Sequence, residues 1–152
     1  MNLTLFSDYS LRVLMFAALQ YPQRFSVADA ARAFSLSQHH LAKVVQNLVR
    51  RGDLETWRGR GGGVSLARRP EQVNLGELLR ATETGTPLVE CFDPVHNRCV
   101  LAGGCRLQSI LHEANRAFFA VLEGYTLEDL IAGNAGDSLR GKLGMTAKGG
   151  VW

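Results

Sequence analysis

The chain contains three cysteines, which lie within fifteen residues and have the spacing C-x7-C-x5-C: Cys91, Cys99 and Cys105. An odd number of thiols cannot all be consumed by internal disulfides, so a disulfide framework explains the pattern poorly. A proline and two glycines in the same window predict a loop that could fold the three thiolates around one point. Thiolates are soft ligands that select zinc, copper(I) or iron–sulfur clusters. The pattern therefore predicts a site with three thiolate ligands, which needs a fourth ligand from elsewhere.

Two histidines are candidates for the fourth ligand. His96 lies inside the cysteine window and His112 lies seven residues after its end. Either would complete a zinc site of the Cys3His type. Such zinc modules usually place their thiols in close pairs, however, and a histidine in a loop is more often solvated than bound to a metal. The residues alone leave the fourth ligand open.

The formal net charge of +3 conceals an asymmetry along the chain. Residues 1–70 carry ten Lys or Arg against four Asp or Glu, a net +6, whereas residues 71–152 carry seven against ten, a net −3. A basic first half joined to an acidic second half favours a nucleic-acid-binding part and a separate part for sensing or association. The alternative is an uneven surface charge without a polyanionic partner.

The first 70 residues have the pattern of a winged helix-turn-helix domain. Apolar residues at helical spacing predict a first helix that begins near Ser7, a second that begins after Ser26, and a third over residues 38–51 that stops at Gly52. Two short strands, 54–57 and 64–67, flank a glycine-rich segment suited to a hairpin tip. Two helices joined by a short turn and followed by a hairpin are typical of a winged helix.

The predicted DNA contacts come from the start of the third helix and from the hairpin tip. In a helix-turn-helix the second helix enters the major groove through its first residues, here Ser37, Gln38, His39, His40 and Lys43. The tip would reach phosphates or a narrow minor groove with Arg58, Arg60, Gly61 and Gly62. A solvated polar helix face and a plain turn are the alternatives, and the tip does not match a phosphate-binding loop of a nucleotide enzyme.

Residues 71–132 form a second predicted part, with a short helix after Asn74, the cysteine loop and a long helix from Cys105 to about Glu123. The apolar stripe of the long helix exceeds the core that a chain of this size offers, which favours a homodimer. Residues 133–152 contain six glycines and few apolar residues, which predicts a flexible tail. The predicted fold class is mainly α with a small β-hairpin.

Several classes are disfavoured. No apolar run approaches the length that spans a bilayer, and the first residues lack the features of a signal peptide, so we expect a cytoplasmic protein with reduced thiols and no membrane partner. No activated nucleophile, pair of catalytic acids or cofactor motif is present. The sequence therefore predicts that the chain is not an enzyme.

Residues 1 to about 132 resemble a known family. The segment Ser7–Arg12, the helix-turn-helix of residues 26–51, the glycine-rich wing 58–66 and the three-cysteine loop occur in the order found in iron–sulfur winged-helix transcription regulators. Within that family the chain is more similar to the NsrR type, which senses nitric oxide, than to the IscR type. An IscR-type site would have a histidine three residues after the third cysteine, where this chain has Gln108.

The resemblance implies a homodimeric repressor that binds palindromic double-stranded operator DNA and holds one iron–sulfur cluster per subunit. A 4Fe–4S cluster is favoured and a 2Fe–2S cluster remains possible. The implied ligands are the three cysteines and Asp8, donated by the other subunit, and nitric oxide is the implied signal that releases DNA. From the residues alone, Asp8 could equally be an acid favoured in a first helical turn and paired with Arg12.

Three alternatives stay open at this point. The first is a regulator of the same family that senses cluster status or redox state. The second is a zinc-stabilised DNA-binding protein without a sensing role. The third is a thiol-oxidation switch in which two of the cysteines form a disulfide.

Overall fold

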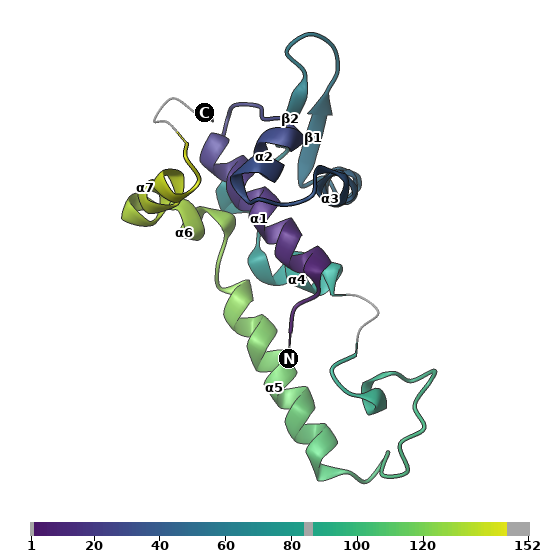
Figure 1. Cartoon of the computed structure of the whole chain (residues 1–152). Coiled ribbons are helices and arrows are strands. Elements are labelled where there is room, and N and C mark those ends of the chain that lie inside the picture. The colour runs from purple at the N-terminus through teal and green to yellow at the C-terminus, as the bar shows by residue number, and fades with distance from the viewer. Residues whose placement is uncertain (1, 84–86, 146–152) are drawn as a thin grey trace.

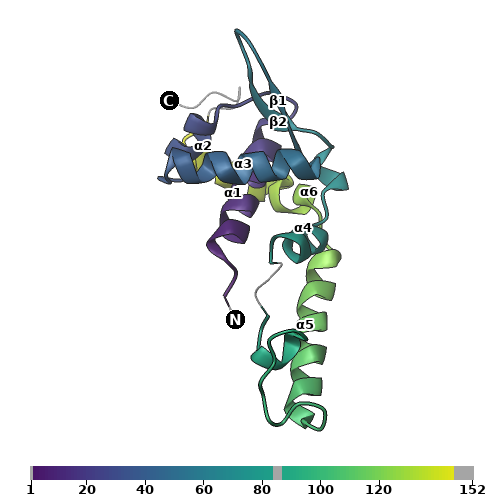
Figure 2. The ribbon, with the colours of Figure 1, turned by 90° about the vertical axis from the view of Figure 1, so that its right-hand side faces the viewer.

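A computed structural model describes residues 2–83 and 87–145 of the chain. Figures 1 and 2 show a globular part that carries the two strands, and a long helix, α5, that projects from it with the cysteine loop at its far end. The elements in chain order are α1 (Leu5–Gln20), α2 (Val27–Ala33), α3 (Gln38–Arg51), β1 (Leu54–Trp57), β2 (Gly63–Leu66), η1 (Pro70–Gln72), α4 (Leu75–Thr82), η2 (Glu90–Phe92), α5 (Arg106–Glu123), α6 (Leu127–Ile131) and α7 (Gly133–Lys142).

The core of the globular part surrounds α1. This helix contacts α3, β2, α4 and α6, and its side chains Leu14 and Phe16 are fully buried. Phe16 packs edge-on against Phe25 and Phe34, with ring centroids 5.2 and 6.1 Å apart. The apolar side of α3 completes this core with Leu41, Val44, Val45 and Leu48. The polar side of α3 is thereby left on the surface.

The hairpin is a two-stranded antiparallel sheet. Its register pairs Leu54 with Leu66 at the base and Trp57 with Gly63 at the tip. The second strand thus begins one residue earlier than the sequence predicts. An isolated bridge between Phe25 and Val64 adds the segment before α2 to the edge of β2. The winged helix-turn-helix predicted for the first 70 residues is the fold that the structure shows.

Local capping signals account for several helix ends. Ser26 and Asp29 form a reciprocal capping box at the start of α2. Gly52 ends α3 in the left-handed conformation, with φ +78°, which glycine adopts without strain. The first helix begins at Leu5 rather than near Ser7, because Thr4 is its N-cap and accepts a hydrogen bond from the Ser7 amide.

The expectation of a flexible tail from residue 133 is wrong for residues 133–145. Gly133–Lys142 form α7, which packs on α6, and Met145 is 7% exposed in the core of the globular part. The guanidinium of Arg140 donates a hydrogen bond to the carbonyl of Leu19 at the end of α1. The prediction from glycine-rich composition failed because tertiary contacts stabilise this helix. Residues 146–152 lie outside the described residues.

The long helix α5 is only partly covered by its own chain. Its C-terminal end packs on α4, where Phe119 is 9% exposed. Gly76 permits this contact, since a Cβ there would lie 2.7 Å from the backbone nitrogen of Glu123. Towards the N-terminal end of the helix, Leu107 and Ile110 are 59% and 48% exposed. Much of the apolar stripe therefore has no partner within the described chain.

No helix in the described part of the chain is long and apolar enough to cross a membrane.

Candidate functional site

The α3 residues that are predicted to contact DNA lie together on the surface. Ser37, Gln38, His39, His40 and Lys43 are all exposed at the N-terminal end of the helix. The rings of the two histidines are 6.1 Å apart and tilted, so they do not stack on each other. These side chains are free to meet a groove because the opposite side of α3 is buried in the core.

The N-terminal end of α3 also carries partial positive charge that no side chain of its own first turn offsets. Ser37 is the N-cap residue, as predicted, but its hydroxyl makes no capping hydrogen bond, and the first turn contains no acidic residue. The backbone N–H groups of a helix N-terminus carry partial positive charge and favour phosphate. The helix end therefore suits a polyanion.

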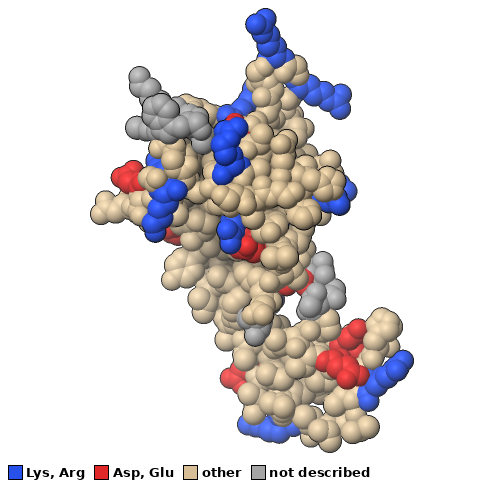
Figure 3. All heavy atoms as spheres, viewed as in Figure 1, with Lys and Arg blue, Asp and Glu red and all other residues tan. Residues whose placement is uncertain are grey.

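The hairpin tip carries Arg58, Arg60, Gly61 and Gly62, and all four are exposed. Figure 3 shows basic side chains projecting from this tip. Gly61 has φ +79°, and a Cβ on Gly62 would lie 2.5 Å from the carbonyl oxygen of Trp57. The glycines thus let the tip turn tightly and leave its arginines outermost.

A buried carboxylate that the sequence analysis did not single out joins the helix to the wing. Asp53 follows α3 and is 1% exposed. It accepts a hydrogen bond from Arg51 Nε at 2.9 Å and a second from the guanidinium of Arg68 beyond β2. Its backbone carbonyl accepts from the Ala67 amide at 3.1 Å. Asp53 therefore fixes the base of the hairpin against the end of α3. An acid directly after a helix-ending glycine and between arginines was the only signal in the sequence.

The three cysteines are free, partly buried thiols on one loop. Polar side chains of the loop order its backbone. Asn97 Oδ1 accepts from the Cys99 amide at 2.9 Å, and Glu90 Oε1 accepts from the Arg98 amide at 2.7 Å. The backbone of the loop is therefore ordered in part by its own side chains.

Two contacts hold the loop against α5. Gln108 Nε2 donates to the carbonyl of Cys91 at 3.1 Å. The ring of Phe92 stacks on the ring of His112, with centroids 3.7 Å apart and planes 11° apart. Both contacts act on the first cysteine or its neighbour. They place that end of the loop on successive turns of one helix face.

Neither histidine considered as a fourth ligand joins the cysteines. His96 Nδ1 pairs with Asp93 Oδ2 at 2.8 Å, and this hydrogen bond, the largest cause, lowers the pKa of the Asp93 carboxyl. His112 is stacked on Phe92. Among the described residues, no three His, Cys, Asp or Glu side chains gather at a point that could hold one metal ion.

Asp8 lies on the first turn of α1, where it pairs with Arg12. Arg12 Nε is 3.1 Å from Asp8 Oδ1, and Arg12 Nη2 is 3.0 Å from Oδ2. The Asp8 side chain is 38% exposed, so solvent or another molecule can reach it. The ion pair predicted for Asp8 is therefore present.

The start of α1 is tied to the end of α4, the helix that leads into the cysteine loop. Glu83 Oε1 accepts from the Thr4 amide at 2.8 Å, and the buried hydroxyls of Ser7 and Thr82 are 2.8 Å apart. Burial raises the pKa of the Glu83 carboxyl, but hydrogen bonds from Ser7 and Thr4 outweigh it and hold the pKa below its ordinary value. A charged Glu83 thus holds Thr4, the N-cap of the helix that carries Asp8.

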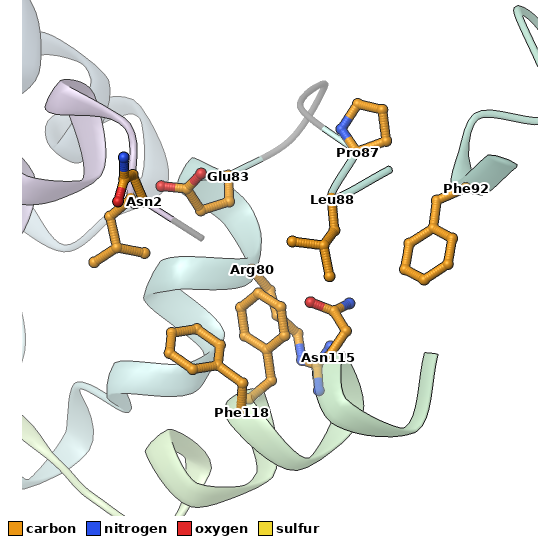
Figure 4. Close-up of a pocket in the computed structure, with 10 residues that line it drawn as sticks. Asn2, Arg80, Glu83, Pro87, Leu88, Phe92, Asn115 and Phe118 are labelled. Carbon is orange, nitrogen blue, oxygen red and sulfur yellow. The ribbon is translucent and has the colours of Figure 1, made fainter. Parts of the chain in front are cut away.

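A pocket of about 490 Å³ lies between the first residues of the chain, α4, α5 and the entry to the cysteine loop. Figure 4 shows Asn2 and Glu83 on one side of it and Phe92 on the other, with Phe118 and Asn115 of α5 between them. Most of the lining is apolar or aromatic. The pocket separates the start of the chain from the entry to the cysteine loop.

Comparison with known proteins gives consistent matches across most of the chain. Residues 3–133 match the Rrf2 family model, described as an iron-dependent transcriptional regulator. The HTH-type transcriptional regulator NsrR of Geobacillus kaustophilus is 48% identical over 144 residues, which cover 94% of this chain and 97% of the relative. That of Bacillus subtilis is 47% identical over 132 residues, which cover 86% and 90%. These relatives are regulators of transcription, in agreement with the prediction that the chain is not an enzyme.

Solved structures show the same fold at lower identity. CymR of B. subtilis, titled the global cysteine regulator, matches with a TM-score of 0.68 and 23% identity over 86% of this chain and 95% of its own. IscR of T. potens matches with a TM-score of 0.67 and 21% identity over 86% of each chain. The family match, the relatives and the winged helix agree, and the chain belongs to the Rrf2 family of transcriptional regulators.

Proposed function

We propose that the chain is a homodimeric, nitric-oxide-responsive repressor whose cysteine loop holds an iron–sulfur cluster. The observation that carries the proposal is the loop itself, which presents three free thiols and is anchored to the helix whose apolar stripe is only partly covered by the described residues. The relatives named NsrR support the same assignment. The cluster would be of the 4Fe–4S type, with 2Fe–2S as the alternative.

The donor set fits such a cluster. Three thiolates on one loop are soft ligands of the kind that iron–sulfur clusters use. A structural zinc site would need a fourth donor at about 2.0–2.3 Å from the same ion. Among the described residues no three His, Cys, Asp or Glu side chains gather at one point, so the three thiols would have to draw together around either kind of metal. Cys91, Cys99 and Cys105 would hold the cluster, and Gln108 and His112 would orient the loop without acting as ligands.

The exposed stripe of α5 supports the dimer. Leu107, Ile110 and Val121 are 59%, 48% and 62% exposed, and side chains of this size on one helix face favour burial against a second apolar surface. A second copy of the chain would supply that surface through the same helix. Two-fold symmetry would then place two recognition helices for successive half-sites of a palindrome, about one DNA turn apart.

The partner subunit is the proposed source of the fourth ligand, Asp8. Within one chain the Asp8 carboxylate is paired with Arg12 on α1, and a dimer could bring it to the cysteine loop of the other subunit. When bound, the cluster supplies iron that nitric oxide can ligate. A carboxylate is a harder and weaker ligand for such iron than a thiolate, so the Asp8 bond would be lost first. Arg12 would then recapture the carboxylate.

Loss of the Asp8 bond would reach the DNA through α1. This helix packs on α3, so a small movement of α1 shifts the recognition helix with it. The spacing of two recognition helices must match the operator, and a small rotation of one against the other weakens binding. The proposed signal thus changes the relative position of the two recognition helices, and the residues of α3 and the wing that contact DNA stay the same.

Purification under anaerobic conditions tests the cluster. We expect a brown protein with iron and sulfide, and we expect Cys91→Ala, Cys99→Ala and Cys105→Ala each to abolish stable loading while the helical content persists. A colourless protein that contains zinc, or no metal, would refute the proposal. A single cysteine variant with full iron and sulfide would remove that residue from the ligand set.

Mixed dimers test the origin of Asp8. One subunit carries Asp8→Ala and the other carries Cys99→Ala. Ligation across the interface places both lesions on one cluster, so the other cluster keeps the native absorption and reaction with nitric oxide. Ligation within a subunit damages both clusters. Two damaged clusters, or a spectrum insensitive to Asp8→Ala, would exclude the partner subunit as the source.

The proposed DNA-binding residues are tested by salt dependence. Lys43→Ala, Arg58→Ala and Arg60→Ala should each weaken binding and reduce the slope of log affinity against log salt by about 0.9 for each phosphate that the variant no longer neutralises. Gln38→Ala and His40→Ala should instead reduce the preference for specific over random DNA. Unchanged slopes in the three basic variants would remove these residues from the interface.

A further inference from the structure

The segment before α2 pairs with the free edge of β2 in the hairpin. The Phe25 amide donates to the Val64 carbonyl at 2.9 Å, and the Val64 amide donates to the Phe25 carbonyl at 2.8 Å. Gly63 makes the close approach possible, because a Cβ there would lie 2.8 Å from the Phe25 oxygen. This pairing places Arg24, the preceding residue, beside the hairpin, 34 positions away in sequence from Arg58.

The Arg24 side chain spans the hairpin from its stem to its tip. Its guanidinium carbon lies 3.9 Å from the ring centroid of Trp57, the last residue of β1. Its Nη1 donates to the carbonyl of Gly61 in the tip at 3.4 Å. One planar group therefore stacks on an aromatic face and binds a loop carbonyl, a combination that arginine provides and lysine does not.

Trp57 is itself held in place. Its indole Nε1 donates to Ser65 Oγ on the facing strand at 2.9 Å, and Ser65 Oγ donates to Glu55 Oε1 at 3.0 Å. The ring is thus a fixed platform on the sheet, although it remains 43% exposed. A guanidinium stacked on a fixed ring can restrain the tip, which has four glycines among residues 58–63 and little stiffness of its own.

We propose that Arg24 is a positioning residue for the wing: it braces the tip so that Arg58 and Arg60 are ordered before they meet DNA, and it does not contact phosphate itself. The inference rests on the proposed contacts of Arg58 and Arg60. Its physical basis is preorganisation. A glycine-rich loop that must be ordered on binding loses affinity, and a brace supplied by the folded protein removes part of that cost.

A double-mutant cycle tests the brace. The probes are a random-sequence duplex of about 30 base pairs and the tightest duplex selected from a random library, each bound by the full-length protein purified anaerobically. Arg24→Gln should weaken binding about two- to tenfold in the otherwise native chain, the range expected for removing a stacked guanidinium and the order it imposes. In the Arg58→Ala/Arg60→Ala background the same change should have no effect, because Arg24 then has no wing arginines to position.

A conservative variant separates bracing from charge. Arg24→Lys keeps the charge but loses the planar fork, so it should bind as weakly as Arg24→Gln. Lys142→Gln removes one exposed charge at the end of α7 and serves as the matched control, with less than a twofold effect. Thermal melts should show each variant folded. If Arg24→Gln unfolds the hairpin, two variants of Trp57 supply the same comparison. Trp57→Phe keeps an aromatic ring under the guanidinium and Trp57→Leu removes it, so only Trp57→Leu should weaken binding.

The outcomes are distinct. Equal losses from Arg24→Gln in both backgrounds, with rescue by lysine, would show that Arg24 is a direct phosphate contact and would overturn the brace. No loss in either background would also overturn it. Native affinity in the Arg58→Ala/Arg60→Ala protein would overturn the proposed wing contact, and the brace with it.

Discussion

Replacement of Asp53 by asparagine should destabilise the protein without changing the shape of the side chain. The Asp53 side chain is 2% exposed and accepts from Arg51 and Arg68, whose side chains are 27% and 42% exposed. Asparagine keeps the volume but removes the charge and turns one acceptor into an N–H donor. That donor would face a guanidinium, which can only donate.

The expected loss follows from the exposure of the partners. Removal of one member of a buried ion pair costs about 3–5 kcal/mol when the remaining charge stays buried. Both arginines reach solvent and can be rehydrated, so the loss should approach that of one charge-assisted hydrogen bond, about 2 kcal/mol. For a chain of this length such a loss lowers the midpoint of thermal unfolding by about 4–8 °C.

Thermal unfolding followed by circular dichroism, at one protein concentration so that association does not shift the midpoint, measures this loss. Asp137→Asn, an exposed acid on α7, is the matched control and should cost less than about 0.5 kcal/mol. The loss from Asp53→Asn should persist in about 1 M salt, because solvent ions screen a buried pair weakly. A midpoint within 1 °C of the native protein would refute the reasoning and show that desolvation of Asp53 cancels its ion pairs.

Three further predictions concern packing and capping. Leu127→Ala should cost about 2–5 kcal/mol in urea unfolding, since Leu127 is 0% exposed in the core; a loss below about 1 kcal/mol would contradict the docking of α6. Gly76→Ala should push α5 off α4 and cost about 1–3 kcal/mol, with a smaller dimer fraction by size-exclusion chromatography; an unchanged elution profile would argue against it. The Ser26 hydroxyl lowers the pKa of Asp29 more than any other group does, so the stability that Asp29 contributes is present above its unfolded pKa and lost as pH falls through the folded one. Asp29→Asn should therefore destabilise at pH 7, and the difference from the native protein should shrink below about pH 4; a constant difference would exclude the charge as its source.

The predicted boundaries that were accurate depend on interactions between near neighbours. The capping box of Ser26 and Asp29 and the left-handed Gly52 each involve residues at most four positions apart. Such interactions are encoded in a short window, so the pattern of residue types is sufficient to predict them. The winged helix-turn-helix could be predicted because it is built mainly from these windows and short connections.

The candidate site divides in the same way. The exposure of the α3 and wing residues could be predicted because apolar periodicity indicates which face of a helix is buried. The grouping of three cysteines on one loop is a fact of the sequence alone. The contacts of Gln108 and His112 with that loop were not predicted, because they join residues 17 and 20 positions apart through the path of the loop.

The sequence by itself determined the start of α2, the end of α3, the wing and the three-thiol loop, because local geometry and residue chemistry decide them. Only the tertiary structure decided that residues 133–142 form a helix on the core, that Asp53 joins α3 to the wing, and that Arg24 lies on Trp57. The last of these contacts joins residues 33 positions apart, and α7 is held by an arginine bound to the distant end of α1. Their free energy arises only when the whole chain is folded, because burial and close approach then supply what the local sequence lacks.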